Sequence, residues 1–257
     1  MSADVATVLA LFVLIVTAVG LLAFLQARHR AAREEEWRAS AASRGWRFEA
    51  ATERGHRVHR WTGTTDGVAW RAESLRKLTG GQNKHRRRRH IARWHGAWAP
   101  GIASPIVLIG VPKGKETPAF EVPKGDGLFV RLAQQAAGAM FDKALDVYFG
   151  DEIGGEVDAR DLQRVEDARV PGFIVSAADA GEARRVLQQG LERALAEATS
   201  SRDSVLADDD RPYVLLRPKG ISLARLAQFR DTQEIERFIR AGLALTRAFT
   251  FGRPSPF

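Results

Sequence analysis

The sequence predicts an α+β protein in which an N-terminal transmembrane helix precedes a mainly antiparallel sheet packed with amphipathic helices. Three observations predict this class. An unbroken apolar run begins at Val5 and ends at Leu25. Short segments that alternate apolar and polar residues, as strands do, follow between residues 46 and 98 and recur after residue 172. Segments with apolar residues at helical spacing separate the later strands, in an order too irregular for a doubly wound parallel sheet.

The apolar run is long enough to cross a bilayer. At ~1.5 Å per residue in a helix it spans ~30 Å, which matches the hydrocarbon thickness of a membrane. A cleaved signal peptide is the alternative, but it requires a positively charged start, a shorter apolar core and a small-residue cleavage site. Only the acidic Asp4 precedes this run. We therefore expect residues 1–27 to be an uncleaved single-pass anchor whose partner is the lipid bilayer.

Basic residues set the expected orientation of this anchor. Arg28, Arg30 and Arg33 follow the run and no Lys or Arg precedes it, so the positive-inside bias places the N-terminus outside and the C-terminal domain in the cytoplasm. The expected location is the inner (cytoplasmic) membrane. The absence of cysteine from the sequence fits a reducing compartment and excludes disulfides. Residues 28–45 are good helix formers and predict a juxtamembrane helix that ends at Gly45.

The first strands are predicted by alternation over residues 46–50, 56–64 and 68–75. Thr65-Asp66-Gly67 provides turn chemistry between the second and third of them, which predicts a hairpin. A short apolar segment rich in Val and Ile, 104–112, predicts a buried strand. Further strands are expected over residues 172–177, 213–218 and 220–226.

Three amphipathic helices complete the expected fold. The first covers residues 128–148, and the other two begin at Asp179 and Asp231. Each of these aspartates has a glutamate three residues later, Glu182 and Glu234, as in a capping box. We expect two α+β subdomains, 46–150 with the basic strand and 151–257.

Most of the net charge of +8 lies in one segment. Residues 77–96 carry seven Lys and Arg and no Asp or Glu, and they contain "HRRRRHIARWH". As a strand, this stretch would place Trp94 on a face that is buried beside Trp70, while Arg87, Arg89 and Arg93 lie on a face that stays in water. A helix is the alternative, which Gly96 and Pro100 disfavour.

The candidate contacts to an anionic surface are five arginines: Arg86, Arg87, Arg88, Arg89 and Arg93. If they face the bilayer, anionic lipid headgroups are the expected partner. Nucleic acid is less favoured, and another membrane protein is a further alternative. A charged strand that is merely solvated, and protected from pairing with other chains by its charge, needs no partner.

Catalytic and metal-binding patterns are not found in the sequence. It has no nucleophile elbow, no zincin motif and no dinucleotide-binding glycine motif. His85, His90 and His95 are five residues apart, so neither a strand nor a helix brings all three to one ion. We therefore expect no cofactor, no metal and no catalytic residue, and a membrane-anchored interaction or scaffold domain. An unrecognised enzyme is the alternative.

The segments "RGWRFEA", "GTTDGVAWRAES" and "RRRRHIARW" together resemble bacterial single-pass membrane proteins of unknown function. In those proteins an arginine-rich strand follows a hairpin of the form G-T-x-x-G-x-x-W. The resemblance is best over residues 44–98. It implies a single membrane anchor and supplies no catalytic residue.

Overall fold

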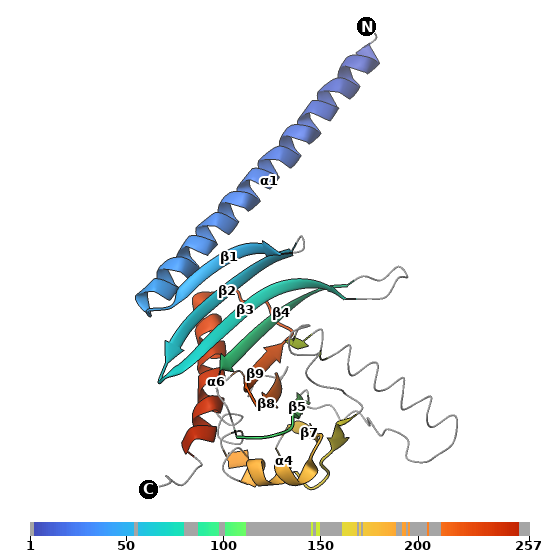
Figure 1. Ribbon diagram of the computed structural model, residues 1–257. Helices are drawn as coiled ribbons and strands as arrows, with labels where there is room; N and C mark the ends of the chain where they lie inside the picture. The colour runs from blue at the N-terminus through green and yellow to red at the C-terminus, as the bar shows by residue number, and fades with distance from the viewer. Residues whose placement is uncertain are drawn as a thin grey trace, which may run out of the picture. The chain divides into compact units, whose positions relative to one another are not determined.

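A computed structural model gives the fold of the 257-residue chain (Figure 1). It describes residues 3–53, 56–79, 87–97, 101–111, 145, 148–149, 161–168, 170, 172–188, 192–193, 195, 205 and 212–251. The chain forms two compact units, Met1–Phe48 and Glu49–Phe257. The predicted class is confirmed, because a long apolar N-terminal helix is followed by an antiparallel sheet with further helices.

The first unit consists largely of α1 (Ala3–Ser43), a continuous helix about 60 Å long at 1.5 Å per residue. It joins the predicted anchor and the predicted juxtamembrane helix in one element. The helix ends as expected at Gly45, which has φ 71°. The amide of Gly45 donates to the carbonyl of Ala42, and that of Trp46 donates to Ala41, so the last carbonyls are satisfied by a Schellman motif. Near this end, the ring of Trp37 meets that of Phe48 edge-on.

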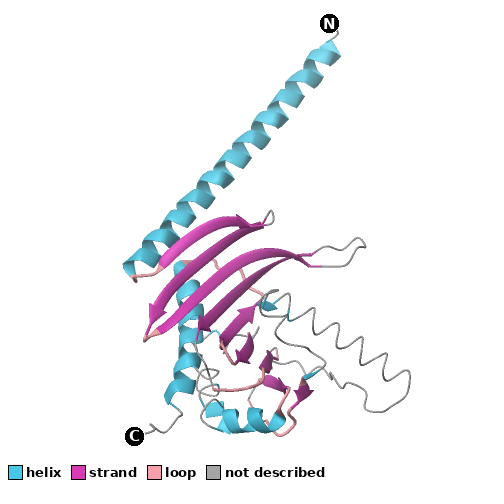
Figure 2. Cartoon of the chain, viewed as in Figure 1, coloured by secondary structure: helices cyan, strands magenta, loops and turns pink. Residues whose placement is uncertain are grey.

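The second unit is built on one sheet, which Figure 2 shows as a continuous set of strands. In the described residues the strand order is β1-β2-β3-β4-β9-β8-β5-β7-β6, and every pair with a defined register is antiparallel. The strands are β1 (Arg47–Glu53), β2 (His56–Thr65), β3 (Val68–Thr79), β4 (Arg87–Ala97), β5 (Ile106–Gly110), β6 (Gln163–Arg164), β7 (Phe173–Ala177), β8 (Tyr213–Arg217) and β9 (Gly220–Arg225).

Both predicted subdomains contribute strands to this sheet. β4 from the first pairs with β9 from the second, and β5 pairs with both β7 and β8. The predicted boundary at residue 150 lies outside the described residues, as does most of the predicted helix 128–148, of which Leu145, Tyr148 and Phe149 are described and helical. The short strand β6 was not predicted.

The predicted hairpin is present between β2 and β3. Asp66 and Gly67 both have positive φ, 52° and 76°, as a two-residue type I′ turn requires. Asp66 accepts this conformation because Asp tolerates the left-handed region better than most residues. The expected strand geometry of the basic segment is also confirmed, since β4 runs as a strand from Arg87 to Ala97.

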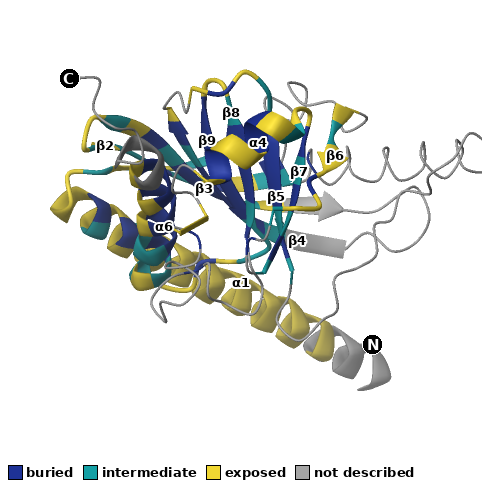
Figure 3. Cartoon of the chain, turned by 90° about the horizontal axis from the view of Figure 1, so that it is seen from below, coloured by how far each residue is buried: buried dark blue, intermediate teal, exposed yellow. Residues whose placement is uncertain are grey.

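One face of the sheet holds the core predicted around Trp94. The register places Trp70, Ala72 and Trp94 on this face, and their side chains are buried. Figure 3 shows the central strands β8 and β9 coloured mainly as buried. Helix α6 (Thr232–Phe251) lies against β4 and β9 on this side. A Cβ atom added to Gly242 of α6 would stand 2.2 Å from the Trp94 ring, so the helix backbone rests directly on the indole. The ring of Phe229 bridges Trp61 and Phe238.

Both predicted helix N-caps are present, but neither is a capping box. Asp179 caps α4 (Ala180–Val186) and Asp231 caps α6, each accepting from the amide three residues on. In a capping box the glutamate would bond back to the amide of the cap residue. Glu182 bonds instead to the loop before β5, and Glu234 accepts from the amide of Arg230. Glu182 therefore contacts a loop distant in the sequence, and Glu234 contacts the residue that precedes its own N-cap.

Candidate functional site

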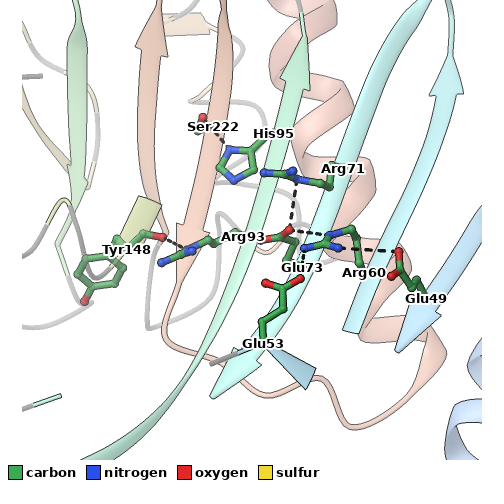
Figure 4. A network of polar contacts seen from close by, with 9 residues as sticks. All are labelled: Glu49, Glu53, Arg60, Arg71, Glu73, Arg93, His95, Tyr148 and Ser222. Carbon is green, nitrogen blue, oxygen red and sulfur yellow. Dashed lines mark hydrogen bonds and ion pairs between the residues drawn. The ribbon is translucent and has the colours of Figure 1, made fainter. Parts of the chain in front are cut away.

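The opposite face of the sheet carries a row of charged residues that the alternation of β4 predicted only in part. In the register, Glu73 of β3 lies opposite Arg60 of β2 on one side and Arg93 of β4 on the other. His95 lies opposite Arg71 of β3 and Ser222 of β9. Figure 4 shows these side chains converging on one surface of the sheet. We call this set, with Glu49 and Glu53, the polar face.

Glu73 is the centre of the polar face. Its side chain is 8% exposed, and its Oε1 accepts from Nε of Arg60 at 2.9 Å and lies 3.3 Å from Nε of Arg71. Arg60 also contacts Glu53 at 2.9 Å and Glu49 at 3.8 Å. A buried carboxylate is stable only when its charge is compensated, and two guanidinium groups provide that compensation here.

The pKa of Arg60 is raised above its ordinary value. Burial acts to lower it, and the bonds and charges of Glu73 and Glu53 outweigh that effect. Arg60 is consequently charged throughout the physiological range. Such a network stiffens β2 and β3 and leaves little free charge for a ligand.

Arg93 corrects the prediction that the arginine face stays in water. The residue is only 8% exposed, and its Nε donates to the carbonyl oxygen of Tyr148 at 2.6 Å. The Tyr148 ring lies against the Tyr213 ring, with centroids 3.9 Å apart. Leu145 and Phe149 join a buried cluster on this face with Val107, Leu215 and Ala224. The segment around Tyr148 thus covers Arg93, and Arg93 is not a surface contact.

His95 is also covered, which the prediction of a wet face missed. Its Nδ1 lies 2.9 Å from Oγ of Ser222, a residue with no exposed surface. Burial, and then the charges of Arg71, Arg93 and Arg217, lower the pKa of His95 to about 3. The imidazole is therefore neutral at physiological pH. Nothing in the sequence indicated that His95 and Ser222, 127 positions apart, would meet.

The contact between His95 and Ser222 resembles a serine nucleophile beside its general base, but the surroundings of the two residues oppose that use. A general base must accept a proton near neutral pH, and burial together with three guanidinium groups makes the protonated imidazole of His95 unfavourable. A nucleophile must also reach a substrate, whereas Ser222 is fully buried. The pair is better suited to holding β4 and β9 together.

No metal site is formed by the residues that the structure describes, since no group of three or more His, Asp and Glu side chains there could hold an ion. The same part of the chain includes His90 and His95. His85 lies outside the described residues.

The five arginines predicted to contact an anionic surface lie in different parts of the structure. Arg86 lies outside the described residues. Arg87, Arg88 and Arg89 form the first part of β4, where they pair in register only with the last residues of β3. The pairing of β9 with β4 ends at Ala92. We call residues 76–79 of β3 and 87–91 of β4 the basic ribbon.

Charges in the basic ribbon are arranged differently from those of the polar face. Lys77 is paired with Arg89, and Arg76 is paired with His90. The pKa of His90 is lowered by burial and by the charge of Arg76. In the polar face, by contrast, the carboxylate of Glu73 compensates the charges of Arg60 and Arg71. In the ribbon, the register sets basic residues opposite one another.

The helix α1 is long and apolar enough to cross a membrane by length and composition. Between residues 11 and 25 its large apolar side chains are exposed in this structure. Its arginine-rich continuation after Leu25 belongs to the same helix.

Comparison with known proteins found no match to this chain among protein-family models, curated proteins or solved structures. The resemblance to bacterial single-pass membrane proteins therefore stays a prediction. The function must be inferred from the helix α1, the polar face and the basic ribbon themselves.

Proposed function

We propose that this protein is a membrane-anchored interaction domain, without catalytic activity. In this proposal α1 crosses the inner membrane with the N-terminus outside, and the unit Glu49–Phe257 works in the cytoplasm. Its role is to hold a binding surface at the membrane. The enzyme alternative receives no support from the polar face, where the ionic groups compensate one another and His95 is kept neutral.

The observation that carries the proposal is the apolar surface of α1. From Leu11 to Leu25 its large apolar side chains are 43% to 65% exposed. This surface continues for about four helical turns, around the whole circumference of the helix. A soluble protein rarely leaves so much contiguous apolar surface in water, because each exposed Å² costs about 25 cal/mol. A bilayer would cover it.

The orientation follows from the charged residues on the C-terminal side of the apolar run. Arg28, Arg30 and Arg33 lie within the first turns after Leu25. Lys and Arg close to the end of a span are retained on the cytoplasmic side. This favours a cytoplasmic location for the sheet.

Membrane insertion can be tested on the full chain with a matched pair of variants. Lys substitutions at Leu14 and Ile15 place two charges at the centre of the run, each costing about 3 kcal/mol of insertion free energy. The same substitutions at Ala31 and Ala32 leave the run intact. We expect the first variant, but not the second, to be extracted from membranes by alkaline carbonate. An extractable wild type would refute the anchor. An N-terminus missing from the mature protein would identify a signal peptide.

Topology is tested by fusing reporters after Phe257. Green fluorescent protein is expected to fluoresce and alkaline phosphatase to be inactive, because the first folds in the cytoplasm and the second requires the periplasm. The opposite pattern would reverse the orientation.

The interaction role is tested in living cells with a photoreactive amino acid at exposed positions of the second unit, such as Gln233 and Arg164. We expect adducts with a protein or lipid from some positions and none from others. Uniformly absent adducts across all faces would contradict a binding role.

A further inference from the structure

The basic ribbon extends beyond the strands on either side of it. The register of β2 with β3 ends where Val58 meets Leu75, and that of β9 with β4 ends where Arg225 meets Ala92. The pairing of β3 with β4 continues past both points to Thr79 and Arg87 (Figure 1). In the described residues, the ribbon is therefore a two-stranded projection in which β3 and β4 are in register only with each other.

Basic residues are opposite one another along this projection, and Lys77 with Arg89 is a pair of like charges. Lys77 is opposite Arg89 and Arg76 is opposite His90. Directly opposed like charges destabilise an antiparallel pair. Three positions further into the sheet the same two strands pair Glu73 with Arg93, which is the stabilising combination. In register, β3 and β4 thus place opposite charges together at Glu73 and Arg93, and like charges together at Lys77 and Arg89.

We infer that the basic ribbon binds anionic lipid headgroups on the surface of the membrane that α1 crosses. This inference rests on the proposed function, because the anchor provides the membrane. An anionic surface relieves the repulsion between the paired cations, and it attracts each of them. The described residues of the ribbon include five Lys and Arg, namely Arg76, Lys77, Arg87, Arg88 and Arg89.

The anchor makes a weak contact of this kind effective. Residues 26 to 43 continue α1 for about 27 Å, and the sheet begins at Arg47. The second unit is consequently confined within a few tens of Å of the bilayer. Tethering makes the contact intramolecular and raises its effective concentration, so a modest affinity for headgroups is sufficient.

Single-stranded nucleic acid fits the structure less well, although it also carries negative charge. Binding of single strands uses aromatic side chains on which bases stack. Trp61, Trp70 and Trp94 are 1%, 4% and 0% exposed, and they lie on the core face of the sheet. They are not available for stacking. A lipid surface needs only the charges.

The test uses the full chain in nanodiscs of neutral lipid, or of neutral lipid mixed with phosphatidylserine, both containing a nitroxide-labelled lipid. Since the chain contains no cysteine, a fluorophore can be attached at one site by Thr79→Cys, at the end of β3, or by Gln233→Cys as a control on α6. The ribbon variant combines Arg87→Gln, Arg88→Gln and Arg89→Gln. The control variant, with an equal loss of charge, combines Arg164→Gln, Arg184→Gln and Arg240→Gln.

We expect quenching of the probe at position 79 in anionic discs, weaker quenching in neutral discs, and loss of quenching at high salt. Each basic residue near an anionic surface is worth about a fivefold change in binding. The ribbon variant should therefore lower the ratio of bound to unbound ribbon roughly 100-fold, whereas the control variant should not change it. The probe at position 233 should remain unquenched throughout.

Equal quenching at position 79 in neutral and anionic discs, or quenching that survives in the ribbon variant, would overturn the inference. So would oligonucleotide binding that the ribbon variant abolishes, if the probe is unquenched in anionic discs. Failure of the anchor is recognised separately, as a chain that does not co-elute with the discs. In that case the same measurement with added anionic vesicles decides whether the ribbon binds lipid.

Discussion

The contact between Gly242 of α6 and Trp94 of β4 gives the most stringent test of the core. A Cβ atom at position 242 would stand 2.2 Å from Cδ2 and 2.5 Å from Cε2 and Cε3 of the Trp94 ring. Ordinary contacts between carbon atoms are about 3.5 to 4.0 Å. The Gly242→Ala variant therefore requires α6 or the indole to move by more than 1 Å. The indole cannot retreat freely, because a Cβ at Gly96 would stand 2.4 Å from its far edge.

Two effects of Gly242→Ala oppose each other. Alanine in a helix interior is favoured over glycine by about 1 kcal/mol. Overpacking a filled core costs typically about 1 to 3 kcal/mol and sometimes more. Since the clash involves a helix backbone and a fully buried ring, we place the cost at or above the upper end of that range. The net loss in free energy of unfolding should be about 2 kcal/mol, which lowers Tm by roughly 4 to 8 °C for a unit of this size.

The assay is thermal unfolding of the full chain in detergent, followed by near-ultraviolet circular dichroism of the tryptophans. Ala244, an exposed position on the same helix, provides the control: Ala244→Gly should lose about 1 kcal/mol through helix propensity alone. If Gly242→Ala leaves Tm unchanged or raises it, α6 does not rest on Trp94 as described.

Three further predictions concern buried polar groups. Glu73→Gln removes the charge that compensates two arginines and should cost about 3 kcal/mol of unfolding free energy. Glu53→Gln removes a half-exposed ion pair and should cost under about 1 kcal/mol. Chemical denaturation of both variants tests the difference. The pKa of His95 is about 3 in the folded protein and about 6.5 in the unfolded chain. The free energy of unfolding should therefore be complete above about pH 6.5 and fall as the pH decreases toward 3, by up to about 1.4 kcal/mol per pH unit. A His95→Asn variant whose stability falls equally steeply in acid would contradict this. The Glu182 carboxylate accepts from two loop amides and the Ser104 hydroxyl, and these bonds lower its pKa against the opposing effect of burial. Glu182→Ala should therefore cost about 2 to 3 kcal/mol of unfolding free energy, and in the wild type this contribution should be present above about pH 4.5 and disappear at lower pH. Urea titrations that find equal losses at pH 7 and pH 3.5 would refute it.

Several features were predictable because they depend on neighbours in the sequence. An aspartate three residues before an amide that needs a partner forms an N-cap wherever the helix lies, as at Asp179 and Asp231. Asp66-Gly67 adopts the turn that suits it, and Gly45 ends α1 because it tolerates positive φ. The two faces of β4 follow from strand alternation alone.

Other features were not predictable because alternation separates residues into two faces without saying what covers each face. Charge at Arg93 was interpreted as a sign of exposure, and that interpretation was wrong. The residue is buried because the carbonyl of Tyr148, 55 positions away, accepts its hydrogen bond and a cluster of apolar residues covers the surface beside it. The same holds for Glu182, whose carboxylate was expected at its own helix cap and instead holds the loop at Ser104.

The sequence by itself determined the elements of this protein: an apolar helix of membrane length, strands with their turns, capped helices and a concentration of positive charge in one segment. Each depends on composition or on contacts within a few residues. The tertiary structure alone decided that Glu73 pairs with Arg60 of the neighbouring strand, that His95 meets Ser222, and that Arg93 leaves the basic surface while the backbone of residues 87–89 extends beyond the neighbouring strand β9. The reason is that register between strands and coverage by distant segments depend on packing the whole chain at once.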